Sequence, residues 1–180
     1  MVKDIPGRHG RFFHRATVNC SVETAWDVFT DHEGYTEFTQ SPTRLIKEGK
    51  MDRNGLGAIR ELGVAELEEL LVREVVNYWV PNEVFGYHVI EARDHQPSHH
   101  QGVVRFFPKG ENRTEWVYSM RMIITPKMEE LFPTIYDEFL KGFREFMHDL
   151  ESECERRGHP IEIPVFPPSC EDEAIERGLS

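Results

Sequence analysis

The sequence lacks any apolar run long enough to cross a membrane. No run approaches the ~20 apolar residues that a membrane-spanning helix needs, so we expect no stable membrane insertion. The stretch MVKDIPGRHGR at the N-terminus has no apolar segment of the kind that signal peptides carry. We therefore expect a cytoplasmic protein.

Cysteine and basic residues are also scarce. The three cysteines, Cys20, Cys154 and Cys170, lie far apart without a CxxC spacing, which predicts reduced thiols rather than a disulfide framework or a zinc site. The formal net charge of -11 argues against nucleic acid as a partner, because binding to its phosphates depends on clustered Lys and Arg.

Motifs that would assign a reaction or a cofactor are absent too. The chain has no GxSxG, P-loop, GxGxxG or HExxH motif. Three histidines, His95, His99 and His100, gather in a proline-containing loop. Catalytic zinc sites place their ligands on rigid elements that hold each ring in position. We therefore expect neither a metal nor a cofactor.

The chain does contain a long series of strand patterns. Residues 11–19 alternate so that Phe12 and His14 share one face with Ala16 and Val18. Further strand-like runs lie at 43–49, 56–64, 67–79, 83–92, 101–108 and 114–124. Their connections are too short for crossover helices, which predicts an antiparallel sheet of seven strands. Residues 64–76 include strong helix formers, but their valines favour an extended chain, so we assign them to a strand.

Helical patterns occur at two places. Ser21 is a good N-cap for a short amphipathic helix, and a second short turn is predicted over 33–38. After Pro126 the apolar residues recur every three or four positions, which predicts a long helix over about residues 127–156. Pro133 lacks an amide hydrogen, so the main helix either begins there or kinks there.

These elements predict one α+β domain with an extension at each end. A sheet with an apolar face must be covered, and the C-terminal helix is the element able to cover it. We expect a curved, seven-stranded antiparallel sheet wrapped around that helix over residues 11–157, with two short helices after the first strand. Residues 1–10 form an N-terminal extension and residues 158–180 a proline-rich acidic tail.

The tail has an apolar edge, formed by Ile161, Ile163 and Val165. Burying such side chains stabilises a fold by ~1.5–3 kcal/mol each, so we expect this edge to make a structural contact. It should lie along the sheet, over the cavity mouth or against a second subunit, which would make a homodimer. A disordered terminus is the alternative.

Four stretches of the chain combine the strand, turn and helix patterns described above: VNCSVETAWDVFTDHEGYTEF, GLGAIREL, REVVNYWVPNEVFGYHV and NRTEWVYSM. They resemble the SRPBCC superfamily, whose helix-grip fold includes START lipid-transfer domains, the birch-pollen allergen family and polyketide cyclases. The resemblance covers about residues 11–155 and implies a cavity between sheet and helix. It implies binding of a small hydrophobic or aromatic molecule, such as a lipid, a polyketide-like compound or an isoprenoid.

Two other functions stay open. The chain could be an enzyme, a cyclase or dehydratase resembling the polyketide branch, in which His14 and a cavity arginine or tyrosine would polarise and deprotonate the substrate. It could also be a protein-interaction module with a filled core. No motif transfers the chemistry of one branch of the superfamily to this chain, so the fold alone does not choose between them.

Candidate ligand-binding residues come from the expected inner face. His14 could orient a ligand oxygen or act as an acid or base, although a histidine satisfied by a core neighbour is the simpler interpretation. Arg60 and Arg105 could pair with a carboxylate or phenolate if they point inward, whereas strand arginines usually face solvent. Aromatic and thioether groups suit either a pocket or an ordinary core. The remaining candidates are Tyr87, Trp116, Tyr118, Met120, Tyr136, Phe139 and Phe143.

Overall fold

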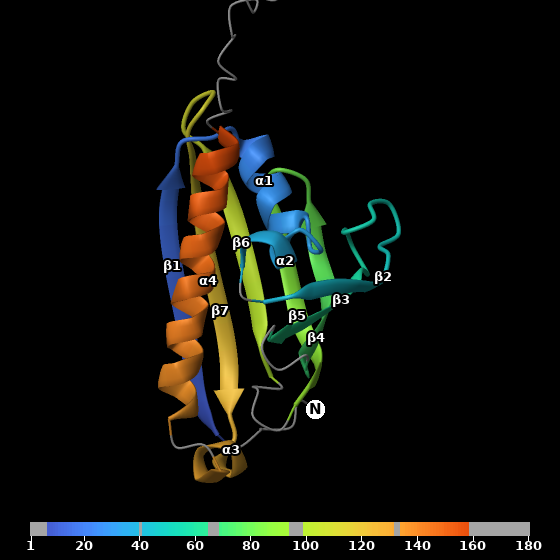
Figure 1. The fold of residues 1–180 in the computed structure, drawn as a ribbon, viewed down its shortest axis with the longest axis vertical. Helices are drawn as coiled ribbons and strands as arrows, with labels where there is room; N and C mark the ends of the chain where they lie inside the picture. The colour runs from blue at the N-terminus through green and yellow to red at the C-terminus, as the bar shows by residue number, and fades with distance from the viewer. Residues whose placement is uncertain (1–6, 40, 65–68, 94–98, 132–133, 159–180) are drawn as a thin grey trace, which may run out of the picture.

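The fold is one open sheet of seven antiparallel strands with a long helix across one face (Figure 1). The computed structural model describes residues 7–39, 41–64, 69–93, 99–131 and 134–158. The strands are β1 (Arg8–Val18), β2 (Thr43–Lys47), β3 (Ile59–Val64), β4 (Glu69–Val80), β5 (Val84–Ala92), β6 (Gln101–Pro108) and β7 (Thr114–Ile124). Their spatial order is β1-β7-β6-β5-β4-β3-β2, and the sheet twists so that β2 and β3 run across the direction of β1.

Two short helices follow β1, as the sequence predicts, and two further helices lie at the C-terminal end. They are α1 (Val22–Thr30), α2 (Tyr35–Phe38), α3 (Pro126–Leu131) and α4 (Ile135–Gly158). Ser21 caps α1 by accepting a hydrogen bond from the amide of Thr24 at 3.1 Å. No helix in the described ranges is long and apolar enough to span a bilayer. The architecture confirms the expected helix-grip arrangement of a sheet, two short helices after β1 and a C-terminal helix.

The predicted C-terminal helix is divided in two. We expected one helix over 127–156, with a start or a kink at Pro133; the structure has α3 and then α4, which begins just after that proline. A proline inside a helix removes one hydrogen bond and clashes with the preceding turn, in keeping with a main helix that begins after Pro133. Residues 1–6 and the tail after Gly158 lie outside the described residues, and so does the apolar edge expected there.

Alternation along the strands separates two faces of the sheet. In β1, Phe12 and Val18 are buried beneath α4 and α1, while Arg11 and Arg15 are exposed on the opposite face. β7 alternates in the same way and pairs with β1 along its full length, with Phe12 opposite Met120. The helix α4 runs along β1 and β7 (Figure 1) and covers the inner face of these strands, while no described helix lies on their outer face.

The core on the inner face is mainly aromatic. Trp116 is fully buried and packs edge-on against Phe29 of α1, with ring centroids 4.8 Å apart. Phe106 packs on the same helix, with ring centroids 5.3 Å from Phe29 and 5.6 Å from Trp26. These contacts fix α1 against the middle strands, beside α4, which runs along β1 and β7 (Figure 1).

Gly102 makes room for two of these rings. A Cβ atom at this position would lie 2.5 Å from the Tyr118 hydroxyl and 2.7 Å from the ring of Tyr87. We predict that Gly102→Ala destabilises the protein by ~1–3 kcal/mol, because both rings are buried and cannot move aside freely. The measurement is the unfolding free energy from urea titration.

The matched control is Gly142→Ala on α4, where an added Cβ would meet nothing within 4 Å. Alanine should stabilise this exposed helical position by ~0.5–1 kcal/mol. Equal effects of the two substitutions would contradict the close approach at Gly102.

Candidate functional site

A buried ion pair lies between β3 and β4. Arg60 and Glu74 are opposite each other in the strand register. Glu74 Oε2 accepts a hydrogen bond from Arg60 Nε at 2.8 Å and forms an ion pair with Nη2 at 2.7 Å. The residues are only 3% and 2% exposed. Burial raises the pKa of Glu74, and the guanidinium partly offsets this rise. Burial alone would lower the pKa of Arg60, but the carboxylate and nearby phenols raise it above its usual value.

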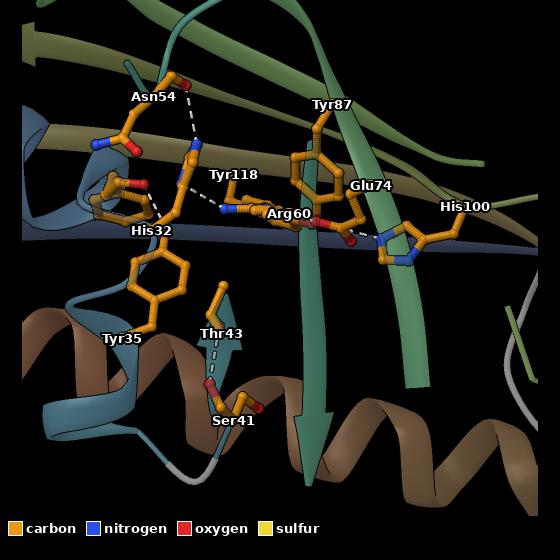
Figure 2. Close-up of polar contacts among 11 residues, drawn as sticks. His32, Tyr35, Ser41, Thr43, Asn54, Arg60, Glu74, Tyr87, His100 and Tyr118 are labelled. Carbon is orange, nitrogen blue, oxygen red and sulfur yellow. Dashed lines mark hydrogen bonds and ion pairs between the residues drawn. The ribbon is translucent and has the colours of Figure 1, made fainter. Parts of the chain in front are cut away.

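The guanidinium of Arg60 is held on its other side by His32 and by aromatic rings (Figure 2). Arg60 Nη1 donates to His32 Nδ1 at 3.0 Å, so His32 Nε2 carries the hydrogen and donates to the Asn54 carbonyl at 3.0 Å. Its Cζ atom lies 4.8 Å from the ring centroid of Tyr87 and 5.3 Å from that of Phe85. These cation–π contacts and hydrogen bonds fix the plane of the arginine.

A chain of neutral polar groups continues from this pair toward α4. The hydroxyls of Tyr87 and Tyr118 lie 2.5 Å apart, and Tyr87 Oη is 3.3 Å from His100 Nε2. β5, β7 and the residue preceding β6 supply these three side chains, all of them buried. We call Arg60, Glu74, Tyr87, Tyr118 and His100 the buried polar cluster.

Burial sets the protonation of this cluster. It lowers the pKa of His100 to about 3, assisted by the positive charge of Arg60, and lowers the pKa of His32 well below its usual value. Burial also raises the pKa values of Tyr87 and Tyr118 above the ordinary phenol range. At neutral pH the cluster therefore holds one ion pair surrounded by uncharged hydroxyl and imidazole groups.

Phenylalanines of α4 cover the cluster. Phe143 lies 5.1 Å from Tyr118 and 5.1 Å from Phe12 between ring centroids, and Phe139 lies 5.7 Å from His100. Both phenylalanines are only half-buried. An apolar surface on α4 thus connects the buried polar groups with the outside of the protein.

The family model for polyketide cyclase/dehydrase and lipid transport proteins matches residues 10–155. The chain belongs to this family. The match covers the sheet, both short helices and nearly all of α4. A comparison with curated protein sequences gave no match.

Solved structures with the same fold have different activities in their names. The chain is similar to the Zhui aromatase/cyclase of Streptomyces sp. R1128, with a TM-score of 0.68, 19% identity and coverage of 84% of this chain and 97% of that one. It is also similar to norcoclaurine synthase of Thalictrum flavum in complex with dopamine and hydroxybenzaldehyde, with a TM-score of 0.57, 14% identity and coverage of 82% of this chain and 88% of that one. A START superfamily protein of Mycobacterium smegmatis gives a TM-score of 0.61, 15% identity and coverage of 81% of this chain and 99% of that one. At these identities the likeness establishes the fold alone.

Most of the candidate residues face the interior of this polyketide cyclase-like domain. Trp116, Tyr118 and Met120 share the buried face of β7, with Tyr87 buried beside them on β5. Phe139 and Phe143 contact the buried polar cluster from α4, and Arg60 is a member of it. Tyr136 belongs to α4, but its side chain lies outside the described part of the structure.

The prediction of a cavity role for Arg105 is wrong. The residue is exposed and shares the outer face of the sheet with Val117, its partner in register, while Val104 and Phe106 point inward. β6 alternates strictly, so a strand with buried Val104 must turn Arg105 to solvent.

His14 lies on the inner face at the edge of the sheet, away from the buried polar cluster. Its Nε2 is 2.5 Å from Glu151 Oε1 of α4, and the two side chains are 27% and 29% exposed. The ring stacks on Trp116 with centroids 5.1 Å apart. His14 thus has a carboxylate partner of its own, in keeping with the simpler interpretation of a satisfied histidine.

The sequence analysis missed two members of the buried polar cluster, Glu74 and His100, and also His32, which accepts a hydrogen bond from Arg60. The sequence did carry a signal for Glu74, because it lies two residues from both Val72 and Val76 on the same strand and therefore shares their buried face. His100 was considered only as a loop ligand for metal. In the described residues, no three His, Cys, Asp or Glu side chains gather in a metal-binding arrangement.

The two cysteines in the described residues are neighbours in space. Cys20 and Cys154 are both fully buried, and neither forms a disulfide in the described residues. A hydrogen bond from the Cys154 thiol lowers the pKa of Cys20, and the same contact raises the pKa of Cys154. This contact ties the start of α1 to the end of α4.

We predict that Glu74→Gln destabilises the protein by ~3–5 kcal/mol, because it leaves the Arg60 guanidinium buried without a counter-charge. The double variant Arg60→Met/Glu74→Leu should recover most of this loss, since apolar side chains of similar volume need no partner. Urea titration measures both. Glu91→Gln, which breaks the exposed pair with Arg73, should cost at most ~1 kcal/mol. A comparable loss in the control would argue against a buried pair.

A second prediction concerns acid stability. His100 has a pKa of about 3 in the folded protein and an ordinary value of 6.5 when unfolded, so between these pH values the unfolded state binds the additional proton. Its contribution to stability is therefore complete above pH 6.5 and is lost as the pH falls, by up to ~1.4 kcal/mol per pH unit.

The unfolding free energy of His100→Gln should accordingly fall less steeply than that of the wild type between pH 6.5 and 5. His148→Gln, which removes an exposed histidine of α4, should keep the wild-type slope. Identical slopes in wild type and His100→Gln would show that His100 does not remain neutral inside the fold.

Proposed function

We propose that the protein binds a small hydrophobic or aromatic molecule with a polar oxygen, between the sheet and α4. The observation that carries this proposal is the buried polar cluster beneath the half-buried Phe139 and Phe143. Sites for small molecules combine a mostly apolar lining with a few well-placed polar groups that fix orientation. Here the phenylalanines supply the lining, and the hydroxyls of Tyr87 and Tyr118 supply the polar groups.

The energetic cost of the cluster supports a role beyond stability. A buried ion pair is often no more stabilising than apolar side chains of the same volume, because both charges must lose their water. In addition, the buried indole N–H of Trp116, two residues from Tyr118 on the same strand face, has no acceptor among the described residues. Polar groups that contribute little to folding, with one donor unused, suit recognition of a ligand oxygen.

The structural relatives are consistent with an aromatic ligand. The norcoclaurine synthase structure holds dopamine and hydroxybenzaldehyde, which are both phenolic compounds. The name of the Streptomyces relative, aromatase/cyclase, also refers to aromatic chemistry. A lipid remains the alternative ligand, in keeping with the lipid transport part of the family description.

A cyclase or dehydratase is the second candidate function, and the hydrogen-bonded chain from Tyr118 through Tyr87 to His100 favours it. A neutral phenol can donate to a substrate carbonyl and stabilise negative charge on its oxygen. With a pKa of about 3, His100 is a weak base, so the cluster is better suited to polarising a carbonyl than to abstracting a proton. His14 is the remaining candidate base, with Glu151 to orient it.

The proposal is tested with a matched pair of probes, 1-naphthol and naphthalene, by titration calorimetry. The wild type should bind 1-naphthol more tightly, and Tyr118→Phe should reduce that preference about two- to tenfold, the value of one hydrogen bond. Arg105→Gln on the outer face should leave both affinities unchanged.

Each contrary outcome has a clear meaning. Equal affinity of the wild type for the two probes would exclude the polar cluster from ligand recognition. Failure to bind either probe would instead favour a protein-interaction module with a filled core. Turnover of a polyketide substrate that is lost in His14→Ala without unfolding would support the enzyme.

A further inference from the structure

A cavity of about 470 Å³ lies at the ends of β1, β5, β6 and β7. Its polar lining comes from His9, Arg11, His88, His99, Gln101 and Arg121, together with His100 of the buried polar cluster. The strand residues among these occupy positions opposite in direction to the buried Phe12, Tyr87 and Met122, so they belong to the outer face of the sheet. The cavity therefore belongs mainly to the outer face, and it adjoins the buried polar cluster at His100.

Strand register places four of these side chains in one row. His88 pairs with Gln101, Gln101 pairs with Arg121, and Arg121 pairs with Arg11. The row crosses β5, β6, β7 and β1 in a single line, with each residue directly opposite the next. Residues opposite each other on one face have Cβ atoms about 4.5–5.5 Å apart, which is within reach of a shared ligand.

The two arginines are an unfavourable pair without an anion. Arg11 and Arg121 are exposed, directly opposite each other and equally charged, an arrangement that destabilises a sheet. Neither forms an ion pair with a carboxylate of the described residues, although the chain has 32 Asp and Glu against 21 Lys and Arg. In so acidic a chain, two adjacent arginines with no acidic partner among the described residues indicate a requirement for positive charge at this point.

We propose that this outer cavity binds the phosphate group of a small molecule. A dianionic phosphate offers one negative charge to each guanidinium, and guanidinium groups bind phosphate oxygens through paired hydrogen bonds. The Gln101 amide is a further donor. His88 is one as well, because Asn77 Nδ2 donates to its Nδ1 at 3.0 Å and leaves the hydrogen on Nε2.

The size of the cavity indicates more than a bare ion. Its volume of about 470 Å³ lies within the range of ordinary ligand pockets, about 300–1,000 Å³. The phosphate would lie between the arginines, and the rest of the ligand would extend toward His9 and His99. This inference does not depend on the proposed function, because it rests on Arg11 and Arg121, which are exposed on the outer face of the sheet.

The test is calorimetric titration with inorganic phosphate and pyrophosphate at constant ionic strength. Arg11→Gln and Arg121→Gln should each weaken binding at least tenfold. Arg15→Gln and Arg105→Gln are matched controls, since both remove one exposed charge from the same outer face outside the cavity. Their affinities should stay within twofold of the wild type.

Several results would overturn the proposal. Failure of the wild type to bind phosphate or pyrophosphate would do so. An equal loss of affinity in Arg15→Gln and Arg105→Gln would show general attraction of anions to a basic face instead of a site. Tighter binding of malonate than of phosphate would assign the cavity to carboxylates. Thermal unfolding without added anion recognises a variant that fails to fold. Arg121→Gln should melt no lower than the wild type, because the substitution relieves repulsion between the two arginines. Added phosphate should then raise the melting temperature of the wild type but not that of Arg121→Gln.

Discussion

The buried ion pair between Arg60 and Glu74 is the constraint on which the inner half of the structure depends. Two charges can stay in a protein interior only if each has its partner and their remaining hydrogen-bonding groups are satisfied. The register of β3 and β4 brings the two side chains together, and His32 occupies a third donor of the guanidinium. The positive charge also helps to keep His100 neutral, so the ion pair influences a side chain on the far side of the cluster.

Alternation along each strand places neighbouring residues on opposite faces of the sheet. Gly102 lies beneath the two tyrosine rings, and its neighbour Gln101 points the other way into the outer cavity. Tyr118 and Arg121 stand on opposite faces of β7 for the same reason. A slip of one residue in this register would exchange the faces, placing arginines in the core and phenols in solvent. The inner and outer sites are therefore fixed by one pattern of hydrogen bonds between strands.

The sequence predicted the elements well and the contacts between them poorly. Alternation within β7 and the three-to-four spacing in α4 are local signals, so the strands, helices and fold could be read from the chain. Contacts across the sheet depend on register, which local patterns do not reveal. That is why Arg60 and Arg105 received the same interpretation although one is buried and the other exposed. Glu74 could have been found from its alternation with valines, but its pairing with Arg60 could not.

A negative net charge argues against nucleic acid as a partner but does not exclude a small anionic ligand. A total of -11 argues against nucleic acid, which needs many phosphate contacts along an extended surface. One phosphate group needs only the charges close to it, because salt screens exposed charges beyond about 8–10 Å. Arg11 and Arg121 lie within that range of each other as register partners, while many of the acidic side chains belong to other parts of the chain. The proposed binding of a small anion by an acidic protein therefore depends on strand register, which brings Arg11 and Arg121 together with no ion-pairing carboxylate among the described residues.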